Sequence, residues 1–506
     1  MYAGAAMDII SLILERPLVW GLFLAYMVVT FVLAWIGHKK TNGLASFAIG
    51  NGDMHPVVVG ITLAASIAST ATFVINPGFV YVHGISALMH LGVAAGLGVI
   101  LGLVVLSPGF RRVGARTSAL TLPQWVGSRF GSPAMSLYFS AITLLSFTFV
   151  VLIVGGLALV MQATLGMSTT AAAALVIAFV FSYIFVGGAY AHAYTNTLQG
   201  GLMVIVAFLL IYSGLPLLAD GGMARLAAED PNLATAINPS STLFGSTFSV
   251  WVAGFVIGFG LVCQPHILTK ALYVKTDRDV RRYLAVTIAV SLAFTGLLLV
   301  GLYVRLAGLE PTRQDLTMAV WITHAFGPGT TAAVTVAILA AGMSTLDGLL
   351  VALSSTVAND LFLPLAPRRI TEGRSPEQLS ALGVRVSQGV LVLMGIAAFV
   401  VVLDPPKLLG IFGQIGAYGI VAAAAMPIAV GVLLRNIPTG PVFAGAVLGP
   451  ALHLVLWFAG ASANPAVTAT WGIFASIAVA AIGTLMMRRS PGATESDQDS
   501  AARLAA

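Results

Sequence analysis

Charged side chains are scarce in this chain. Asp, Glu, Lys and Arg account for 8% of its 506 residues, whereas soluble domains carry about 25%. This scarcity, together with a hydrophobic content of 58%, excludes a soluble enzyme, a nucleic-acid-binding protein and a disordered chain. A helix that spans a membrane needs roughly 20 apolar residues, and the composition supplies enough for about thirteen such helices. The chain is therefore expected to be an all-α, polytopic membrane protein.

Several other features are missing. Cys263 is the only cysteine, which excludes an intrachain disulfide and a cysteine-based metal site. His90, His192 and His266 are scattered without ligand spacing, which favours packed histidines over metal ligands. There is no Walker motif for ATP, and the apolar segments contain no nucleophile–base pair. We therefore expect no enzymatic activity, no cofactor, no nucleic-acid partner and no obligatory protein partner.

Long apolar runs, broken at charged or Pro/Gly clusters, predict the spans. About thirteen are expected, near residues 18–37, 56–83, 87–107, 133–164, 170–187, 192–217, 246–268, 284–306, 331–359, 384–403, 409–434, 440–460 and 468–487. With the N-terminus outside, most of the 24 Lys and Arg residues fall in inside loops, as cytoplasmic loops require. Segment 18–37 lacks a cleavage site and reads as a retained helix. A multi-pass plasma (inner) membrane protein with a cytoplasmic C-terminus is predicted.

One acidic residue lies inside a predicted span. Asp347 falls within 331–359, where a carboxylate at membrane depth costs at least about 2.5–3.5 kcal/mol and marks a functional position by default. Just before it, Ser344 and Thr345 offer two hydroxyls, and Ala341 a carbonyl three residues back. Hard oxygen ligands of this kind suit a small hard cation. The alternatives are a structural carboxylate bonded to its neighbours, and hydroxyls that bond their own helix.

Two predicted spans carry helix-breaking sequences. Small and hydroxyl residues over 63–72, followed by Asn-Pro-Gly at 76–78, disfavour a straight helix over 56–83. The span 246–268 has three glycines and ends in Gln264-Pro265-His266. Interrupted helices at corresponding places of two halves indicate a transporter site. We expect residues 1–490 to form one transmembrane transporter domain and 491–506 a disordered cytoplasmic tail. Inverted five-helix repeats are expected at 56–217 and 246–434, with helix 18–37 before them and two helices in 440–487 after them.

Three motifs resemble those of the sodium:solute symporter family. Ala-Ala-Gly-Met-Ser-Thr-Leu-Asp at 340–347, with Ser-Ser at 354–355 and Asn-Asp-Leu at 359–361, is similar to one helix of the family. Cys-Gln-Pro-His-Ile at 263–267, with Lys270, and Val-Gly-Gly at 186–188 followed by Thr-Asn-Thr-Leu-Gln-Gly at 195–200 are similar to two others. The resemblance covers about residues 18–490. It implies a leucine-transporter-like fold and sodium-coupled uptake of a small solute by alternating access.

The resemblance also implies a sodium site, with Na⁺ as coupling ion and the only metal. Its ligands would be the hydroxyls of Ser344 and Thr345 and the carbonyls of Ala341, Ala65 and Ala68. Two positions depart from the family. Ile67 stands where proline symporters carry Asp, and Asn196 where some members use Asp for a second sodium site or the ion exit path. One sodium ion per cycle is therefore expected.

The expected partners are a small-molecule solute and the lipid bilayer, and the solute is expected at mid-membrane beside the two breaks. The candidate residues are Thr70, Thr72, Phe147, Phe149, Trp251, Phe255, Gln414 and Tyr418, although packing explains each of them as well. Because no Lys or Arg falls inside a predicted span apart from Arg305 and Arg385 at span ends, a neutral solute, a zwitterion and a small monocarboxylate all stay open. Asp347, one turn cytoplasmic of Ser344, is expected to attract sodium as it leaves. A proton-coupled carrier that uses Asp347, and a sensor with a transporter fold, are the rival hypotheses.

Overall fold

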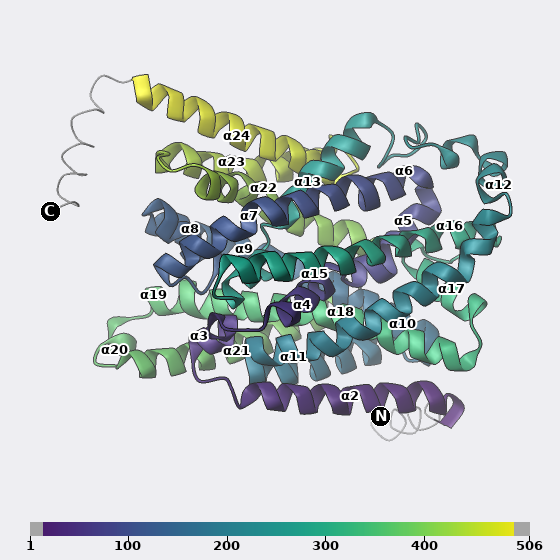
Figure 1. Cartoon of the computed structure of the whole chain (residues 1–506), viewed down its shortest axis with the longest axis horizontal. Helices are drawn as coiled ribbons and strands as arrows, with labels where there is room; N and C mark the ends of the chain where they lie inside the picture. The colour runs from purple at the N-terminus through teal and green to yellow at the C-terminus, as the bar shows by residue number, and fades with distance from the viewer. Residues whose placement is uncertain (1–13, 490–506) are drawn as a thin grey trace.

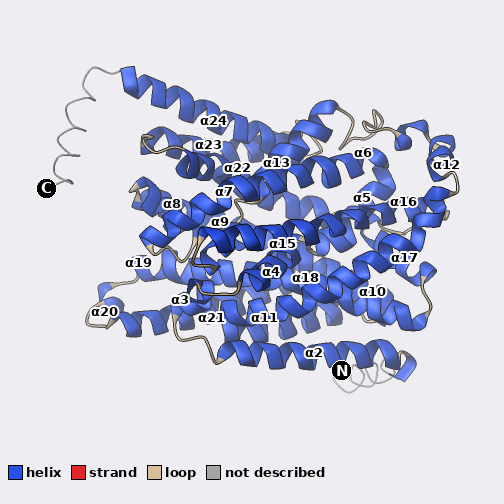
Figure 2. Ribbon diagram, viewed as in Figure 1, coloured by secondary structure: helices blue, strands red, loops and turns tan. Residues whose placement is uncertain are grey.

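The computed structural model describes residues 14–489, and within that range the chain is helical with no β-strand (Figures 1 and 2). Most long helices run roughly parallel to one another in Figure 1. Ten helical stretches are long and apolar enough to cross a membrane, and up to twelve if each of two bent pairs counts as one span. The shorter apolar helix Thr169–Phe185 lies where the sequence predicts the span 170–187. Each remaining predicted span likewise coincides with one of these stretches.

The long helices are α2 (Pro17–His38), α7 (Ala95–Thr117), α9 (Pro133–Thr143) with α10 (Phe147–Leu165), α11 (Thr169–Ala219), α15 (Asp277–Thr295) with α16 (Leu299–Leu306), α18 (Pro328–Thr356), α21 (Pro376–Leu403), α22 (Leu409–Leu433), α23 (Thr439–Phe458) and α24 (Pro465–Arg489). Short helices connect them: α3 (Leu44–Ile49), α6 (Ile85–Leu88), α8 (Leu122–Phe130), α12 (Gly222–Glu229), α17 (Thr317–Ala325), α19 (Leu363–Leu365) and α20 (Arg368–Thr371). Single 3₁₀ or π turns, such as η3 (Met89–Ala94) and η10 (Val357–Phe362), extend several of them.

Both spans predicted to be interrupted are broken. In the first, α4 (Pro56–Ile67) is followed by η2 (Ala71–Ile75) and α5 (Asn76–His83), with a bend of 47°. In the second, η6 (Phe248–Val252) and α13 (Ala253–Leu261) meet α14 (Pro265–Leu268) and η7 (Thr269–Tyr273) at 57°. The first break falls within the run of small and hydroxyl residues. The second falls just before Pro265, which has no N–H to continue the helix.

The predicted boundary between spans 170–187 and 192–217 is a sharp kink rather than a loop. Gly188 adopts φ 53° and ψ −140° inside α11, a conformation that side-chain-bearing residues rarely reach. A Cβ atom there would also lie 2.6 Å from the Phe47 ring. One glycine therefore both turns the chain and lets α3 pack against it.

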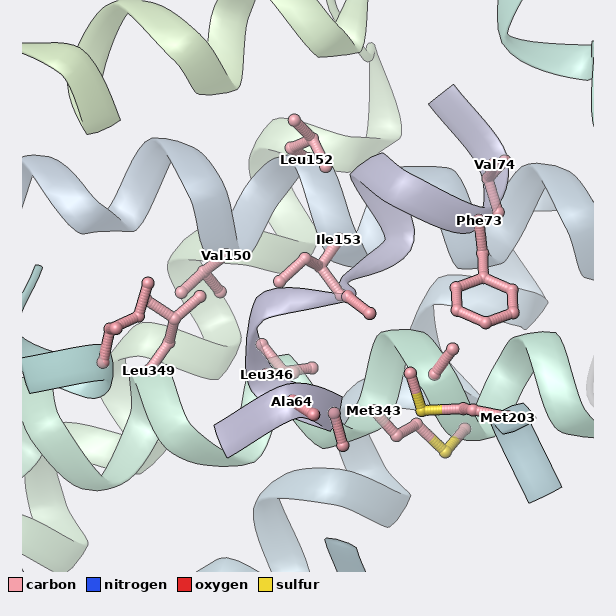
Figure 3. Close-up of a cluster of buried hydrophobic side chains, with 14 of the residues drawn as sticks. Ala64, Phe73, Val74, Val150, Leu152, Ile153, Met203, Met343, Leu346 and Leu349 are labelled. Carbon is pink, nitrogen blue, oxygen red and sulfur yellow. The ribbon is translucent and has the colours of Figure 1, made fainter. Parts of the chain in front are cut away.

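The helix α18 lies at the centre of the bundle and is almost entirely buried. It packs against α2, α4, α10 and α11. Figure 3 shows the apolar side chains around the first break, among them Phe73 of η2, Ile153 of α10, Met203 of α11 and Met343 of α18. This packing keeps the backbone polar groups of the broken helix away from lipid, which is the condition for non-helical backbone at membrane depth.

The chain ends lie on opposite sides of the bundle. The first residues of α2 are on the side of α12, and the last residues of α24 are on the side of α20 (Figure 1). An odd number of spans produces this arrangement. The predicted tail 491–506 lies outside the described residues.

Candidate functional site

The break after α4 leaves two backbone carbonyls free for other partners. The N–H of Ala68 still bonds the Ala64 carbonyl at 2.9 Å, but the N–H of Ser69 turns back to Ile67 at 3.0 Å. The carbonyls of Ala65 and Ser66 instead face two hydroxyls of α18. Ser344 Oγ lies 2.9 Å from the Ala65 oxygen, and Thr345 Oγ1 donates to the Ser66 oxygen at 3.0 Å.

These oxygens form a compact, fully buried group. Ser344 and Thr345 are 0% exposed. Ser344 Oγ is also 2.7 Å from the Ala341 carbonyl, and Thr345 Oγ1 is 3.5 Å from that of Ala65. The structure thus brings together four of the five predicted ligands, Ala65, Ala341, Ser344 and Thr345. It adds Ser66, whose carbonyl the sequence did not single out. Ala68, three residues after Ala65, is the C-terminal capping residue of α4. That its carbonyl binds sodium stays a prediction.

Asn196 joins the same group from α11. Its Nδ2 donates to the Ser344 carbonyl at 3.0 Å and lies 3.4 Å from Ser66 Oγ. Its Oδ1 is buried and has no hydrogen-bond partner among the described residues. The side chain therefore ties the broken helix to α18 and leaves one acceptor free.

Asp347 faces α11 rather than the oxygen group. The hydroxyl of Tyr183 donates to Asp347 Oδ1, and Thr195 Oγ1 donates to Oδ2 at 3.1 Å. The carboxylate is 0% exposed. The sequence predicted the burial but not Tyr183, because nothing local connects residues that lie 164 positions apart.

Lys270 is a second buried charge that the sequence placed elsewhere. It was expected in an inside loop. In the structure it belongs to η7, within the second bent pair, and is 1% exposed. Its Nζ contacts Nε2 of His192. The expectation that Lys270 lies in a loop is therefore wrong, because the helical turns after Pro265 keep its side chain inside the bundle.

A cavity of about 450 Å³ lies between the two broken helices. Its wall includes the first break at Ser66–Ala68, the second at Gln264, and parts of η3, α7, α10, α15 and α22. None of the described residues that line it is Asp, Glu, Lys or Arg. Gln264 Oε1, His266 Nδ1 and Ser291 Oγ are buried there without a hydrogen-bond partner. These three atoms therefore have unused hydrogen-bonding capacity beside the cavity.

The solute candidates divide into two groups. Thr72, Phe149, Gln414 and Tyr418 line this cavity. The other four do not: Thr70 is buried beside Gly156 and Gly342, Phe255 lines a separate groove and is 37% exposed, and Phe147 and Trp251 are half-buried. The sequence missed Gln264 and Ser291, although Gln264 lies in the quoted Gln-Pro-His motif.

Comparison with known proteins assigns the chain to a family. The model of the sodium:solute symporter family matches residues 47–449. The chain belongs to this family. The symporter is 26% identical to a sodium/pantothenate symporter of Haemophilus influenzae over 80% of this chain and 82% of the relative. It is 25% identical to a sodium/proline symporter of Escherichia coli over 86% of each chain.

Solved structures show the same architecture. A sodium-coupled sialic acid symporter in a substrate-bound outward-open state has a TM-score of 0.76, with 15% identity over 93% of this chain and 98% of that one. A nucleobase-cation-symport-1 family transporter in a closed conformation has a TM-score of 0.57, with 14% identity over 90% of this chain and 97% of that one. The symporter therefore has the predicted leucine-transporter-like fold, is a multi-pass integral membrane protein, and performs sodium-coupled solute symport.

Proposed function

We propose that the symporter binds its coupling sodium ion between α4 and α18, at the oxygens of Ala65, Ser66, Ala341, Ser344 and Thr345. One observation supports this most: hydroxyls of α18 meet the carbonyls that the first break frees. Every donor atom is a neutral, hard oxygen, which suits a small monovalent cation. In the structure the two hydroxyls of α18 already bond these carbonyls, so the oxygens are gathered in place for an ion.

Sodium and solute binding are coupled because both proposed sites use the same short segment of chain at the first break. Ser66 and Ala68 line the solute cavity, while the Ala65 and Ser66 carbonyls belong to the proposed ion site. Sodium binds well only when α4 and α18 lie together, so its occupancy favours one conformation and organises the cavity wall in that conformation. Such coupling is typically worth about 1–3 kcal/mol. The membrane potential adds about 2.3 kcal/mol per charge per 100 mV.

The solute is proposed to be a small organic molecule without strong net charge. The cavity offers it neutral polar atoms from Gln264, Ser291, Gln414 and Tyr418, set among apolar side chains. Relatives transport pantothenate and proline, and both molecules combine a carboxylate with an apolar part. A neutral solute, a zwitterion and a small monocarboxylate therefore remain the classes to test.

Sodium is proposed to leave towards the cytoplasm past Asn196 and Asp347, one ion per cycle. Asn196 contacts the Ser344 carbonyl and carries no charge that would hold a second ion. Asp347 supplies the only carboxylate of α18 within one turn of Ser344. We expect Asp347→Asn to slow sodium-driven turnover. Unchanged turnover and unchanged sodium dependence would remove Asp347 from the exit path.

The symporter is further proposed to lie in the plasma membrane with its N-terminus outside. Arg368, Arg369 and Arg374 lie in or beside α20, on the side of the bundle where α24 ends. Cytoplasmic loops carry such positive charge. A cysteine-accessibility scan from each side, with one new cysteine in the α12 region and one near α20, tests this orientation. Labelling of both from the same side would contradict it.

The direct test is uptake into proteoliposomes under an inward sodium gradient and then a matched potassium gradient. The solutes are proline, pantothenate, acetate, pyruvate, a hexose and sialic acid, each radiolabelled. We expect sodium-dependent uptake of one solute, lost in the double variant Ser344→Ala/Thr345→Ala. Ser354→Ala, which removes a buried hydroxyl further along the same helix, is the control and should transport normally. Uptake that follows a proton gradient and ignores sodium would contradict the proposal and favour Asp347 as a proton site.

A further inference from the structure

Three basic side chains gather between the solute cavity and the α8 end of the bundle. They are His192 of α11, His266 of α14 and Lys270 of η7, referred to here as the basic cluster. Their exposed fractions are 0%, 4% and 1%. Lys270 Nζ contacts His192 Nε2, while Nδ1 of both imidazoles is buried without a partner among the described residues. Of the nitrogen atoms in the basic cluster, only Nδ1 of His266 belongs to a site described above, the solute cavity.

The two imidazoles of the basic cluster border a second, small cavity, and Lys270 lies behind His192. This cavity of about 20 Å³ is lined by His192 and His266, and by Ser355, whose hydroxyl is also buried without a partner. Its volume suits about one water molecule. His266 lines both this cavity and the 450 Å³ one. One side chain therefore separates the solute cavity from a polar space beyond it.

The charge of Lys270 has no contacting counter-ion. No carboxylate of residues 14–489 lies within 4.0 Å of its Nζ. Both oxygens of Asp347 accept hydrogen bonds from Tyr183 and Thr195 instead. An ammonium buried in this way costs free energy unless an anion or hydrogen-bond acceptors compensate it.

The backbone leaves room around the imidazoles. At Gly348, a Cβ atom would lie 3.2 Å from His192 Cε1 and 3.6 Å from His266 Cβ. A larger residue on this face of α18 would fill the space between the two rings. Thr121 lines the small cavity and donates a hydrogen bond to Asp360 Oδ2 at 2.5 Å, so an acidic side chain lies behind that part of the wall.

We propose that the basic cluster is a transient binding site for a carboxylate group of the transported solute, used as the solute leaves the central cavity. The proposal rests on the proposed function in one respect, that a solute occupies the central cavity and leaves past His266. The small cavity must widen to admit the group, which the inward-opening half of the cycle supplies. Lys270 and the two imidazole Nδ1 atoms then contact the carboxylate before it passes on.

The test measures thermal unfolding of the full-length protein in lipid nanodiscs, in potassium salts, because low sodium populates the open inward form. Formate, chloride and gluconate are compared at equal ionic strength; gluconate is the reference because its polyhydroxylated chain lacks the apolar part that would pack against the mostly apolar cavity wall. We expect formate to raise the Tm of the native protein by about 2 °C at saturation, more than chloride does. Lys270→Gln should abolish this rise, and Lys270→Arg should retain it. Lys275→Gln removes an exposed lysine close by and should behave as the native protein.

Three results would overturn the proposal. The first is no rise in Tm with formate. The second is stabilisation by chloride alone, which would make this a halide site. The third is a full rise in Lys270→Gln, which would place the anion elsewhere. A sodium titration in gluconate salts keeps this test separate from the proposed function. Loss of sodium stabilisation in the native protein would count against the sodium site, whereas loss of formate stabilisation alone counts against the basic cluster.

Discussion

The two broken helices differ in the chemistry that they expose. The first breaks in a run of small and hydroxyl residues and presents bare carbonyls of Ala65 and Ser66 to α18. The second breaks at Gln264-Pro265 and presents side chains, including the buried Lys270. Their bends are similar, 47° and 57°. Similar backbone geometry in two corresponding places can therefore serve opposite charges: backbone oxygens suit a cation, and basic side chains suit an anion.

The side chains that surround the two breaks also differ. Around the first, apolar side chains such as Ile153, Met203 and Met343 seal the backbone (Figure 3), and Asn196 Oδ1 is a buried polar atom there without a partner among the described residues. Around the second, polar atoms such as Gln264 Oε1 and His266 Nδ1 have no partner among the described residues. Buried polar atoms without partners are costly, so they mark places that a solute or water completes.

The largest effect is expected at the first break. Thr345→Val keeps the shape of the side chain and removes its oxygen, so one sodium ligand is lost. We expect the sodium concentration for half-maximal uptake to rise about tenfold or more, equivalent to about 1.4 kcal/mol or more. Thr345→Ser keeps the oxygen and should stay close to the native value. If the Val and Ser variants need the same sodium concentration for half-maximal uptake, the Thr345 hydroxyl does not bind sodium and the first break is not the cation site.

A large loss of stability is expected where the second broken helix packs against α7. A Cβ atom at Gly258 would lie 2.1 Å from the Ala95 carbonyl oxygen, so a side chain forces α13 and α7 apart. Gly258→Val should lower the Tm by several degrees, consistent with overpacking that costs roughly 1–3 kcal/mol. Gly440→Val, at a site with open space around it, is the control. A Tm like that of the control would show that α13 does not need this close approach.

A smaller effect, on the solute alone, is expected at Gln264. Gln264→Leu removes the free acceptor from the cavity wall while keeping similar volume. One hydrogen bond is worth about 0.5–1.5 kcal/mol, so the KM for the solute should rise about two- to tenfold with the sodium dependence unchanged. Gln162→Leu, at an exposed position, should leave both unchanged. A shift in sodium dependence without a shift in KM would place Gln264 with the ion instead.

The smallest effect is expected outside the spans, at Asp315 before α17. Burial raises the pKa of its carboxyl above 3.8, despite Arg313 at 3.6 Å. A raised native pKa means that the folded state holds its proton more tightly, so stability falls as pH rises from the unfolded value through the native one. Asp315→Asn should therefore raise the Tm by about 1 °C at neutral pH and not at pH 3. A lower Tm at neutral pH would show that the Arg313 pair outweighs burial.

Much of the fold could be predicted from the sequence because its signals are local. Long apolar runs marked the spans, and hydroxyl-rich or Pro-containing stretches marked both broken helices. Ser344 and Thr345 stood out since two adjacent hydroxyls beside Asp347 are unusual in an apolar helix. Their carbonyl partners needed the family resemblance, which proposed Ala65 and Ala68 but not Ser66.

The rest depends on contacts between distant residues or on helix rotation. The bond from Tyr183 to Asp347 joins two helices, and nothing near either residue indicates it. Lys270 followed a span and was placed in a loop, because the inward fold after Pro265 has no local signal. Phe255 and Trp251 were placed at the solute, but a helix that is apolar all round does not specify which face meets a cavity.

The central claim is that sodium binds where α18 meets the first break. The most direct measurement is equilibrium binding of radioactive sodium to the purified symporter and to Ser344→Ala/Thr345→Val, with Lys270→Gln alongside. The account predicts saturable binding by the native protein and by Lys270→Gln, and its loss in the double variant. Binding of equal affinity in the double variant would contradict the account.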